Sequence, residues 1–197
     1  MKKSLAFSLA LLVSTALPAL AAPPSAPPQG APLPKILVVD QAAILQMSKV
    51  GQDIGRQVQA YSNQAKKDLD AQARALQAKG QALQQQVAIL SPEIKAQKVK
   101  DFENQQAALQ ATAQKKESLI QGGLYQARLA IQNALGPVLK QLMDQRGANM
   151  IISKGAVLMA SDGRFDVTQQ AIELLNQKMP SFKVQLVAPP AGMQAQQ

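Results

Sequence analysis

The sequence has 197 residues, with 21 lysines and arginines against 12 aspartates and glutamates, which gives a formal net charge of +9. It contains no cysteine and no histidine, and aromatic residues make up only 3%. Disulfide bonds are therefore excluded, and the commonest metal ligand and neutral-pH proton carrier is missing. The excess positive charge favours an acidic partner.

The N-terminus predicts export from the cytoplasm. A short basic start, Met1-Lys2-Lys3, precedes an apolar run from Leu5 to Leu17 and the small residues Ala19-Leu20-Ala21. This order is typical of a secretory signal peptide, here residues 1–21, and an uncleaved anchor is the alternative. Removal of Lys2 and Lys3 lowers the charge from +9 to +7. Residues 22–34, "APPSAPPQGAPLP", follow as a proline-rich linker.

A short strand and a long helix come next. The run Ile36-Leu37-Val38-Val39 is rich in β-branched residues and predicts a buried strand. From Gln41 to Leu90, and again from Ile94 to Leu142, apolar or small residues recur at steps of three and four. This spacing predicts two amphipathic helical arms, each with a narrow apolar seam close to that of a coiled coil.

The junction between the arms predicts a turn. Ser91 suits the cap of a helix, Pro92 its first position, and Glu93 its positively polarised end. A kinked single rod is the competing interpretation. Because both arms carry an apolar stripe, we expect an antiparallel hairpin over residues 49–146 with its tip at Ser91 and Pro92. The apolar residues at the tip, Ile89, Leu90 and Ile94, are expected to close the hairpin, and contact with a binding partner is the alternative.

Glycines interrupt the second arm at two places. Gly122-Gly123 costs roughly 2 kcal/mol of helix propensity relative to two alanines. The pair is either a hinge or a gap for the ring of Tyr61 on the first arm, and the sequence leaves both open. Gly136-Pro137 is expected to kink or end the helix.

The C-terminal part predicts a small mixed region. Residues 150–153 and 156–160 suggest two strands joined by a Lys154-Gly155 turn. A helix is expected from the cap Thr168, with Val167 packed on Ile172, to a stop at Pro180. Residues 182–186 suggest an edge strand, and residues 188–197 a disordered tail. The predicted fold is mainly α with a small β body (α+β), formed by residues 35–48 and 147–187.

Catalytic motifs are missing. The sequence has no paired carboxylates, nucleophile and base, phosphate-binding glycine loop or metal-ligand spacing. We therefore expect no enzyme activity, no cofactor and no metal. The lysines are dispersed and lack an aromatic stacking platform, so nucleic acid is not an expected partner.

The order of "KILVVDQAAIL", a long helical hairpin, "GANMIISKGAVLMAS" and "FDVTQQAIELLNQKM" resembles the Skp (OmpH-like) family of periplasmic chaperones. The resemblance covers roughly residues 35–180. It implies a homotrimer whose strands form a body, with three hairpins projecting around a cavity. It also implies an ATP-independent holdase that binds unfolded outer-membrane β-barrel proteins there. On this basis the trimerisation body would include Ile36, Val38, Ile151, Ile152, Val157 and Met159.

Clients would be held by dispersed contacts along the arms. A holdase needs adaptable apolar groups and attraction at long range rather than a shaped pocket. Ordinary packing in the seam and ordinary solvated faces are the alternatives for these residues. The candidate client-facing residues are Met47, Tyr61, Phe102, Tyr125, Lys66, Lys67, Lys95, Lys98, Lys100, Lys115 and Lys116.

Two other functions stay open at this point. A structural or adaptor coiled coil of the cell envelope would grip one fixed partner, and a protein of anionic membrane surfaces would use the same positive charge. Some relatives carry a basic cluster linked to lipopolysaccharide, but the corresponding stretch here, residues 120–123, is uncharged.

Overall fold

The computed structural model describes residues 33–160 and 163–192. The chain divides into two units, Met1–Leu33 and Pro34–Gln197, and all described elements belong to the second. The signal peptide, nearly all of the proline-rich linker and the last five residues lie outside the described residues. The elements, in chain order, are β1 (Ile36–Val39), α1 (Gln41–Met47), α2 (Lys49–Gln86), η1 (Val87–Ile89), α3 (Pro92–Arg146), β2 (Met150–Ser153), η2 (Lys154–Ala156), η3 (Gly163–Phe165) and α4 (Thr168–Lys178).

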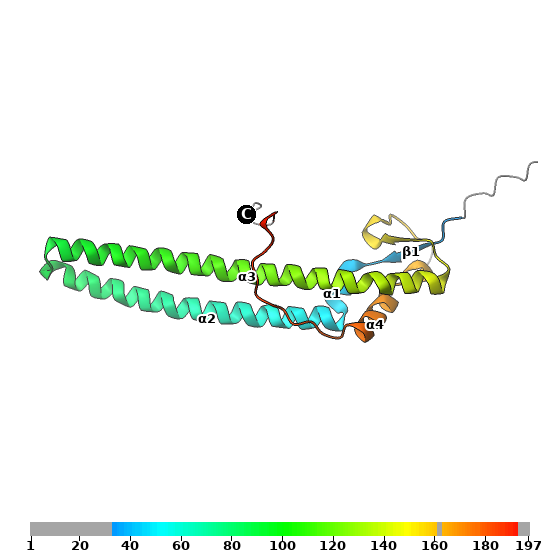
Figure 1. Ribbon diagram of the computed structural model, residues 1–197, viewed down its shortest axis with the longest axis horizontal. Helices are drawn as coiled ribbons and strands as arrows, with labels where there is room; N and C mark the ends of the chain where they lie inside the picture. The colour runs from blue at the N-terminus through cyan, green and yellow to red at the C-terminus, as the bar shows by residue number, and fades with distance from the viewer. Residues whose placement is uncertain (1–32, 161–162, 193–197) are drawn as a thin grey trace, which may run out of the picture. The chain divides into compact units, whose positions relative to one another are not determined.

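Helices α2 and α3 form the expected hairpin and lie side by side (Figure 1). The tip is built as predicted: the Ser91 hydroxyl accepts a hydrogen bond from the Ile94 amide, and Pro92 begins α3. Side chains also bond across the arms, with Lys116 on Asp68 at 2.9 Å and Lys79 on Gln105 at 2.8 Å. The kinked single rod is therefore wrong.

The first arm breaks once, at Ser48, where a single continuous helix was expected. Ser48 is fully buried, and its hydroxyl accepts the Gly51 amide at 3.2 Å. The Lys49 amide donates to the side-chain oxygen of Asn176 in α4. Met47, the last residue of α1 before the break, is 56% exposed.

The second arm is continuous to Arg146, so Gly136-Pro137 does not end it. Helix α3 instead closes at Gly147, whose backbone adopts a left-handed conformation (φ 60°) that favours glycine. Asn149 then donates its amide to Lys35, which places β2 beside β1.

Strands β1 and β2 form a two-stranded parallel sheet, with Ile36 opposite Met150 and Val39 opposite Ser153. Parallel neighbours need a long crossover, and the whole hairpin supplies it. The second strand expected after β2 is absent, because Lys154–Ala156 forms a 3₁₀ turn and residues 157–160 are irregular. In the described part of the chain, the outer edge of β2 pairs with no strand.

The core lies at the base of the hairpin, where the buried side chains of α3 cluster with those of β1, α1, α2 and α4. Val167 and Ile172 both belong to it. The buried apolar residues are Leu37, Val38, Val39, Ile44, Val50, Ile54, Ala127, Ile131, Leu135, Val138, Leu142, Val167, Ala171, Ile172, Leu175 and Val184.

Helix α4 ends before Pro180 as expected, but its start differs from the prediction. The Thr168 hydroxyl accepts the Asp40 amide at 2.9 Å instead of capping its own helix. The carboxylate of Asp166 accepts the Thr168 amide in its place. The side chain of Thr168 therefore joins α4 to the end of β1.

After α4 the chain is extended but forms no strand, so the expected edge strand is wrong. Residues 181–190, which we term the C-terminal strap, pass along α2 and turn onto α3 (Figure 1). Val184 and Pro189 in the strap are buried. The predicted disordered tail is therefore wrong for residues 188–190, which pack on the hairpin.

Candidate functional site

The distal part of the hairpin has a seam but no interior. Between residues 55 and 121 no residue is buried, whereas the seam positions Leu69, Leu76, Leu109 and Ile120 are half-buried. Even these large aliphatic residues are only half-covered, so the two arms touch along a narrow line. The arms consequently expose shallow apolar grooves on their flanks.

One such groove lies where the arms leave the core. It has a volume of about 440 Å³ and a floor that includes Leu69, Ala113 and Ile120. Its flanks carry two lysines and two acidic residues: Lys66, Lys116, Asp70 and Glu117. An apolar floor between flanks of mixed charge can hold an apolar side chain while the charged groups at its edges stay in water. The groove is open and shallow, and it has no catalytic group set around it.

The aromatic candidates are distributed over the hairpin and do not form one site. Phe102 packs on Gly80 across the arms, where an added Cβ would lie 3.1 Å from the ring. Tyr61 is half-buried, and its hydroxyl donates to the Val184 carbonyl at 3.2 Å. Tyr125 is also half-buried. Phe102 and Tyr61 therefore have packing roles in this chain.

The candidate lysines divide into two groups. Lys116 bonds to Asp68, and together with Gln64 it holds the pKa of that carboxyl below its usual value. Lys98 donates to Gln86 on the opposite arm at 3.4 Å. These two help to join the arms. The remaining ones are exposed on the helix surfaces: Lys66, Lys67, Lys95, Lys100 and Lys115.

At the tip, Ile89 is 84% and Ile94 50% exposed, while Leu90 is half-buried. The expectation that all three close the hairpin is therefore wrong for Ile89. Ser91 and Pro92 form the turn itself.

The body candidates lie partly inside and partly outside the core. Val38 is buried, and Ile36, Ile151, Ile152 and Val157 are half-buried. Met159 is 88% exposed, and its neighbour Leu158 is fully exposed. A short sheet with one open edge and exposed apolar residues beside it is suited to association with another chain.

One ionic contact fixes this region. Lys154 bonds to Asp166 at 2.9 Å. Burial raises the pKa of the Asp166 carboxyl, but hydrogen bonds from Thr168 and Lys154 outweigh that effect and hold the pKa below its usual value. The same contact raises the pKa of Lys154.

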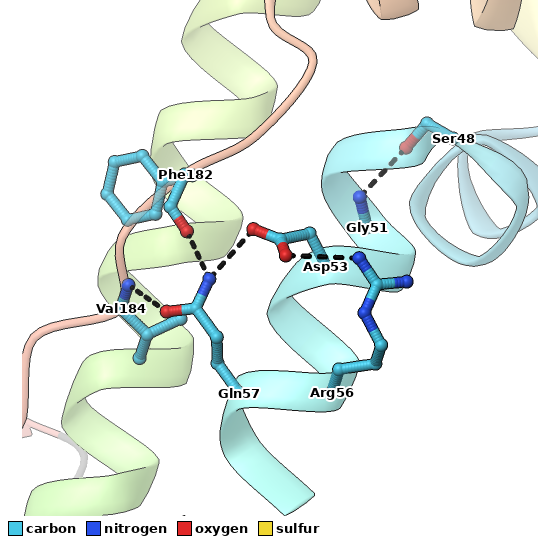
Figure 2. A network of polar contacts seen from close by, with 7 residues as sticks. All are labelled: Ser48, Gly51, Asp53, Arg56, Gln57, Phe182 and Val184. Atoms are coloured by element: carbon cyan, nitrogen blue, oxygen red, sulfur yellow. Dashed lines mark hydrogen bonds and ion pairs between the residues drawn. The ribbon is translucent and has the colours of Figure 1, made fainter. Parts of the chain in front are cut away.

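A polar network that the sequence did not indicate holds the strap (Figure 2). The Gln57 amide nitrogen donates to the Phe182 carbonyl at 2.8 Å, and its oxygen accepts the Val184 amide at 2.9 Å. Asp53 accepts a second bond from the same nitrogen and also pairs with Arg56. Helix α2 contains many glutamines, so the sequence alone does not distinguish Gln57 from the others.

Gly122 and Gly123 lie under the strap. A Cβ on Gly122 would overlap the Val187 carbonyl, and one on Gly123 would overlap the Gln185 carbonyl. The gap is thus occupied by the strap backbone, not by the ring of Tyr61 as one of the two interpretations held. A hinge at this pair stays a prediction.

Within the part of the chain that the structure describes, no three or more histidine, cysteine, aspartate or glutamate side chains gather where they could hold a metal ion. No helix among the same residues is long and apolar enough to cross a membrane.

The comparisons with known proteins agree with this architecture. The family described as outer membrane protein (OmpH-like) matches residues 35–175. The crystal structure of an OmpH-like protein from Caulobacter crescentus CB15, a candidate outer membrane chaperone, superposes with a TM-score of 0.74 at 15% identity. The match covers 84% of this chain and 98% of that chain. None of the curated proteins compared with this chain is significantly similar to it.

The family is one of chaperones and not of enzymes, and its fold of long paired helices on a small sheet is the fold found here. The predicted fold class and family are therefore confirmed, and the chain belongs to the OmpH-like family of outer membrane chaperones.

Proposed function

We propose that the protein is an ATP-independent holdase of the periplasm. It binds unfolded outer-membrane β-barrel proteins between the hairpins of a homotrimer and prevents their aggregation in transit. The observation that carries this proposal is the hairpin from residue 55 to residue 121, which buries no residue. A surface of this kind offers many weak contacts and no shaped pocket, as a binder of diverse unfolded chains requires.

The body supports self-association. Two parallel strands cannot form a stable sheet alone, and parallel sheets are normally covered on both faces. Here β2 has an unpaired edge within the described chain, and Leu158 and Met159 beside it are exposed. Association through Ile36, Val38, Ile151, Ile152, Val157 and Met159 would cover these groups.

The test combines mass with aggregation. In solution the purified protein should have the mass of three chains, and it should suppress light scattering when a porin is diluted from urea. A single-chain mass, or unchanged scattering at excess protein, would contradict the proposal. An adaptor coiled coil would instead retain one folded partner at fixed stoichiometry in a pull-down from envelope extract. A holdase should retain a mixture of unfolded barrels.

A membrane-surface role has a separate test. An interfacial helix would show saturable binding to vesicles of anionic lipid, and the exposed Ile89 and Ile94 among tip lysines are the residues to substitute. The apolar face of each arm is narrow, which favours polypeptide clients over lipid.

A further inference from the structure

The C-terminal strap is held through its backbone as well as through buried side chains. Gln57 and Tyr61 together bond to three main-chain groups: the Phe182 carbonyl, the Val184 amide and the Val184 carbonyl. Main-chain groups are the same in every sequence, so these contacts would hold an extended segment of almost any composition, as in the addition of a strand to a sheet edge.

The side-chain amide of Gln57, which bonds to the strap, is fixed in orientation. Asp53 is acceptor-only when ionised, and so it selects the nitrogen end of the Gln57 amide. The other N–H of that nitrogen then faces the Phe182 carbonyl, while the oxygen faces the Val184 amide (Figure 2). Arg56 in turn pairs with Asp53. The donor and acceptor are therefore set before any segment arrives.

Gly122 and Gly123 complete the site on α3. Without Cβ atoms, they let the strap backbone lie directly on the helix, with the Gln185 and Val187 carbonyls in the space that side chains would occupy. Three strap side chains are also covered: Val184, which is 1% exposed and enters the core, the buried Pro189, and Phe182, which is half-buried and packs against the core. Ser181, Lys183, Gln185 and Leu186 are exposed.

We propose that Gln57, Tyr61, Gly122 and Gly123 form a binding groove for an extended polypeptide with a small aliphatic residue at the position of Val184 and an apolar residue at that of Phe182. The strap is a built-in occupant that an unfolded client segment displaces. That the natural competitor is a client rests on the proposed holdase function, whereas the groove itself does not. The groove lies at the point where the core ends and the open hairpin begins, next to the apolar floor around Ile120.

The test uses full-length variants and a fluorescent peptide with the strap sequence SFKVQLVAPP. Val184→Asp places a charge in the core and should unseat the strap while leaving the groove intact. Since a groove that is mostly closed lowers the apparent affinity by its open fraction, this variant should bind the peptide about tenfold or more tighter than the wild type. Adding Gly122→Ala and Gly123→Ala fills the groove and should abolish the binding. A peptide with Asp at the Val184 position is the control ligand and should not bind.

Several results would overturn the proposal. They are equal affinity of the wild type and Val184→Asp, undiminished binding by the triple variant, or equal binding of the control peptide. If added wild-type protein displaces the peptide from Val184→Asp, the groove takes the strap of a second copy, and the assignment to a client fails.

Circular dichroism of Val184→Asp reports whether it folds. If it does not, exchange at the Val184 amide in the wild type gives the same answer. Excess peptide should accelerate that exchange, and unchanged exchange at saturation would contradict the proposal.

The link to clients is tested separately. Unfolded porin should compete with the peptide for Val184→Asp, and lack of competition would overturn the client assignment. Peptide binding as expected without suppression of porin aggregation would reject the holdase function and retain the groove. Suppression that is equal in all variants, without peptide binding, would reject the groove alone.

Discussion

Single residues at the base of the hairpin have roles opposite to their usual ones. Glycine normally weakens a helix, yet Gly123 permits a contact that a side chain would exclude. Gly55 on α2 is also helical, but an added Cβ there would meet nothing within 4 Å. The two positions thus separate helix propensity from tertiary contact.

We expect Gly55→Ala to stabilise the protein by about 1 kcal/mol through helix propensity alone. Gly123→Ala gains the same propensity but forces the strap off α3, and overpacking of this kind costs about 1–3 kcal/mol. Urea unfolding should therefore show Gly123→Ala to be no more stable than the wild type, and clearly less stable than Gly55→Ala. Equal stabilisation by both substitutions would show that the strap does not lie on Gly123.

Asp166 predicts an acid dependence of stability. Its pKa is lower in the folded chain than in the unfolded one, so its contribution is complete above the unfolded pKa and is lost as pH falls through the folded pKa. The stability difference between the wild type and Asp166→Asn should be largest near neutral pH and should shrink between about pH 5 and pH 2. Urea titrations across this range measure it. Asp70→Asn, at an exposed site on α2, is the control for removing a carboxylate and should change the stability little.

At the level of elements, the sequence predicted the turn at the tip of the hairpin but not the break in its first arm. The Ser91-Pro92 turn was predictable because the cap and the proline act on their own neighbours. The break at Ser48 was not, because the apolar spacing runs through it and the Asn176 side chain that accepts the Lys49 amide lies 127 residues away.

The wrong prediction of a strand at residues 156–160 and the failure to predict the strap have related causes. An apolar run such as residues 156–160 predicts burial, but it does not specify which surface provides it, and Leu158 is uncovered in the described chain. The alternation in residues 182–186 correctly indicated extended backbone. Its partners are helical side chains instead of a strand, and Gln57 could not be distinguished from the other glutamines of α2.

The uneven burial along the hairpin predicts uneven opening. Residues 122–142 contribute seven buried positions to α3, whereas residues 55–121 contribute none. Since local opening follows buried contact density, backbone amides of residues 66–116 should exchange with solvent much faster than those of 127–142. Hydrogen–deuterium exchange with mass spectrometry checks this. Uniform protection along α3 would contradict it and would indicate that the arms are covered in solution.

At the level of the whole molecule, the buried apolar residues and the exposed candidate lysines lie in different regions. The body and the base of the hairpin hold the buried apolar residues, while residues 55–121 of the arms carry five exposed candidate lysines and no buried residue. No single lysine is placed to define a site, so any effect of the net charge must be collective. A collective field acts before contact and is sensitive to salt, whereas short-range apolar contacts are much less so.

Salt should therefore slow the capture of an acidic client more than it weakens the complex. The Debye length falls from about 30 Å at 0.01 M salt to about 3 Å at 1 M, which removes attraction beyond direct contact. Stopped-flow fluorescence with an unfolded acidic porin should show an association rate that drops about tenfold or more over this range, with a smaller change in dissociation. The single substitution Lys67→Gln should leave the rate nearly unchanged, while neutralising the five exposed candidate lysines together should reproduce much of the effect of high salt at low salt. An association rate that is independent of salt would assign client capture to the apolar grooves alone.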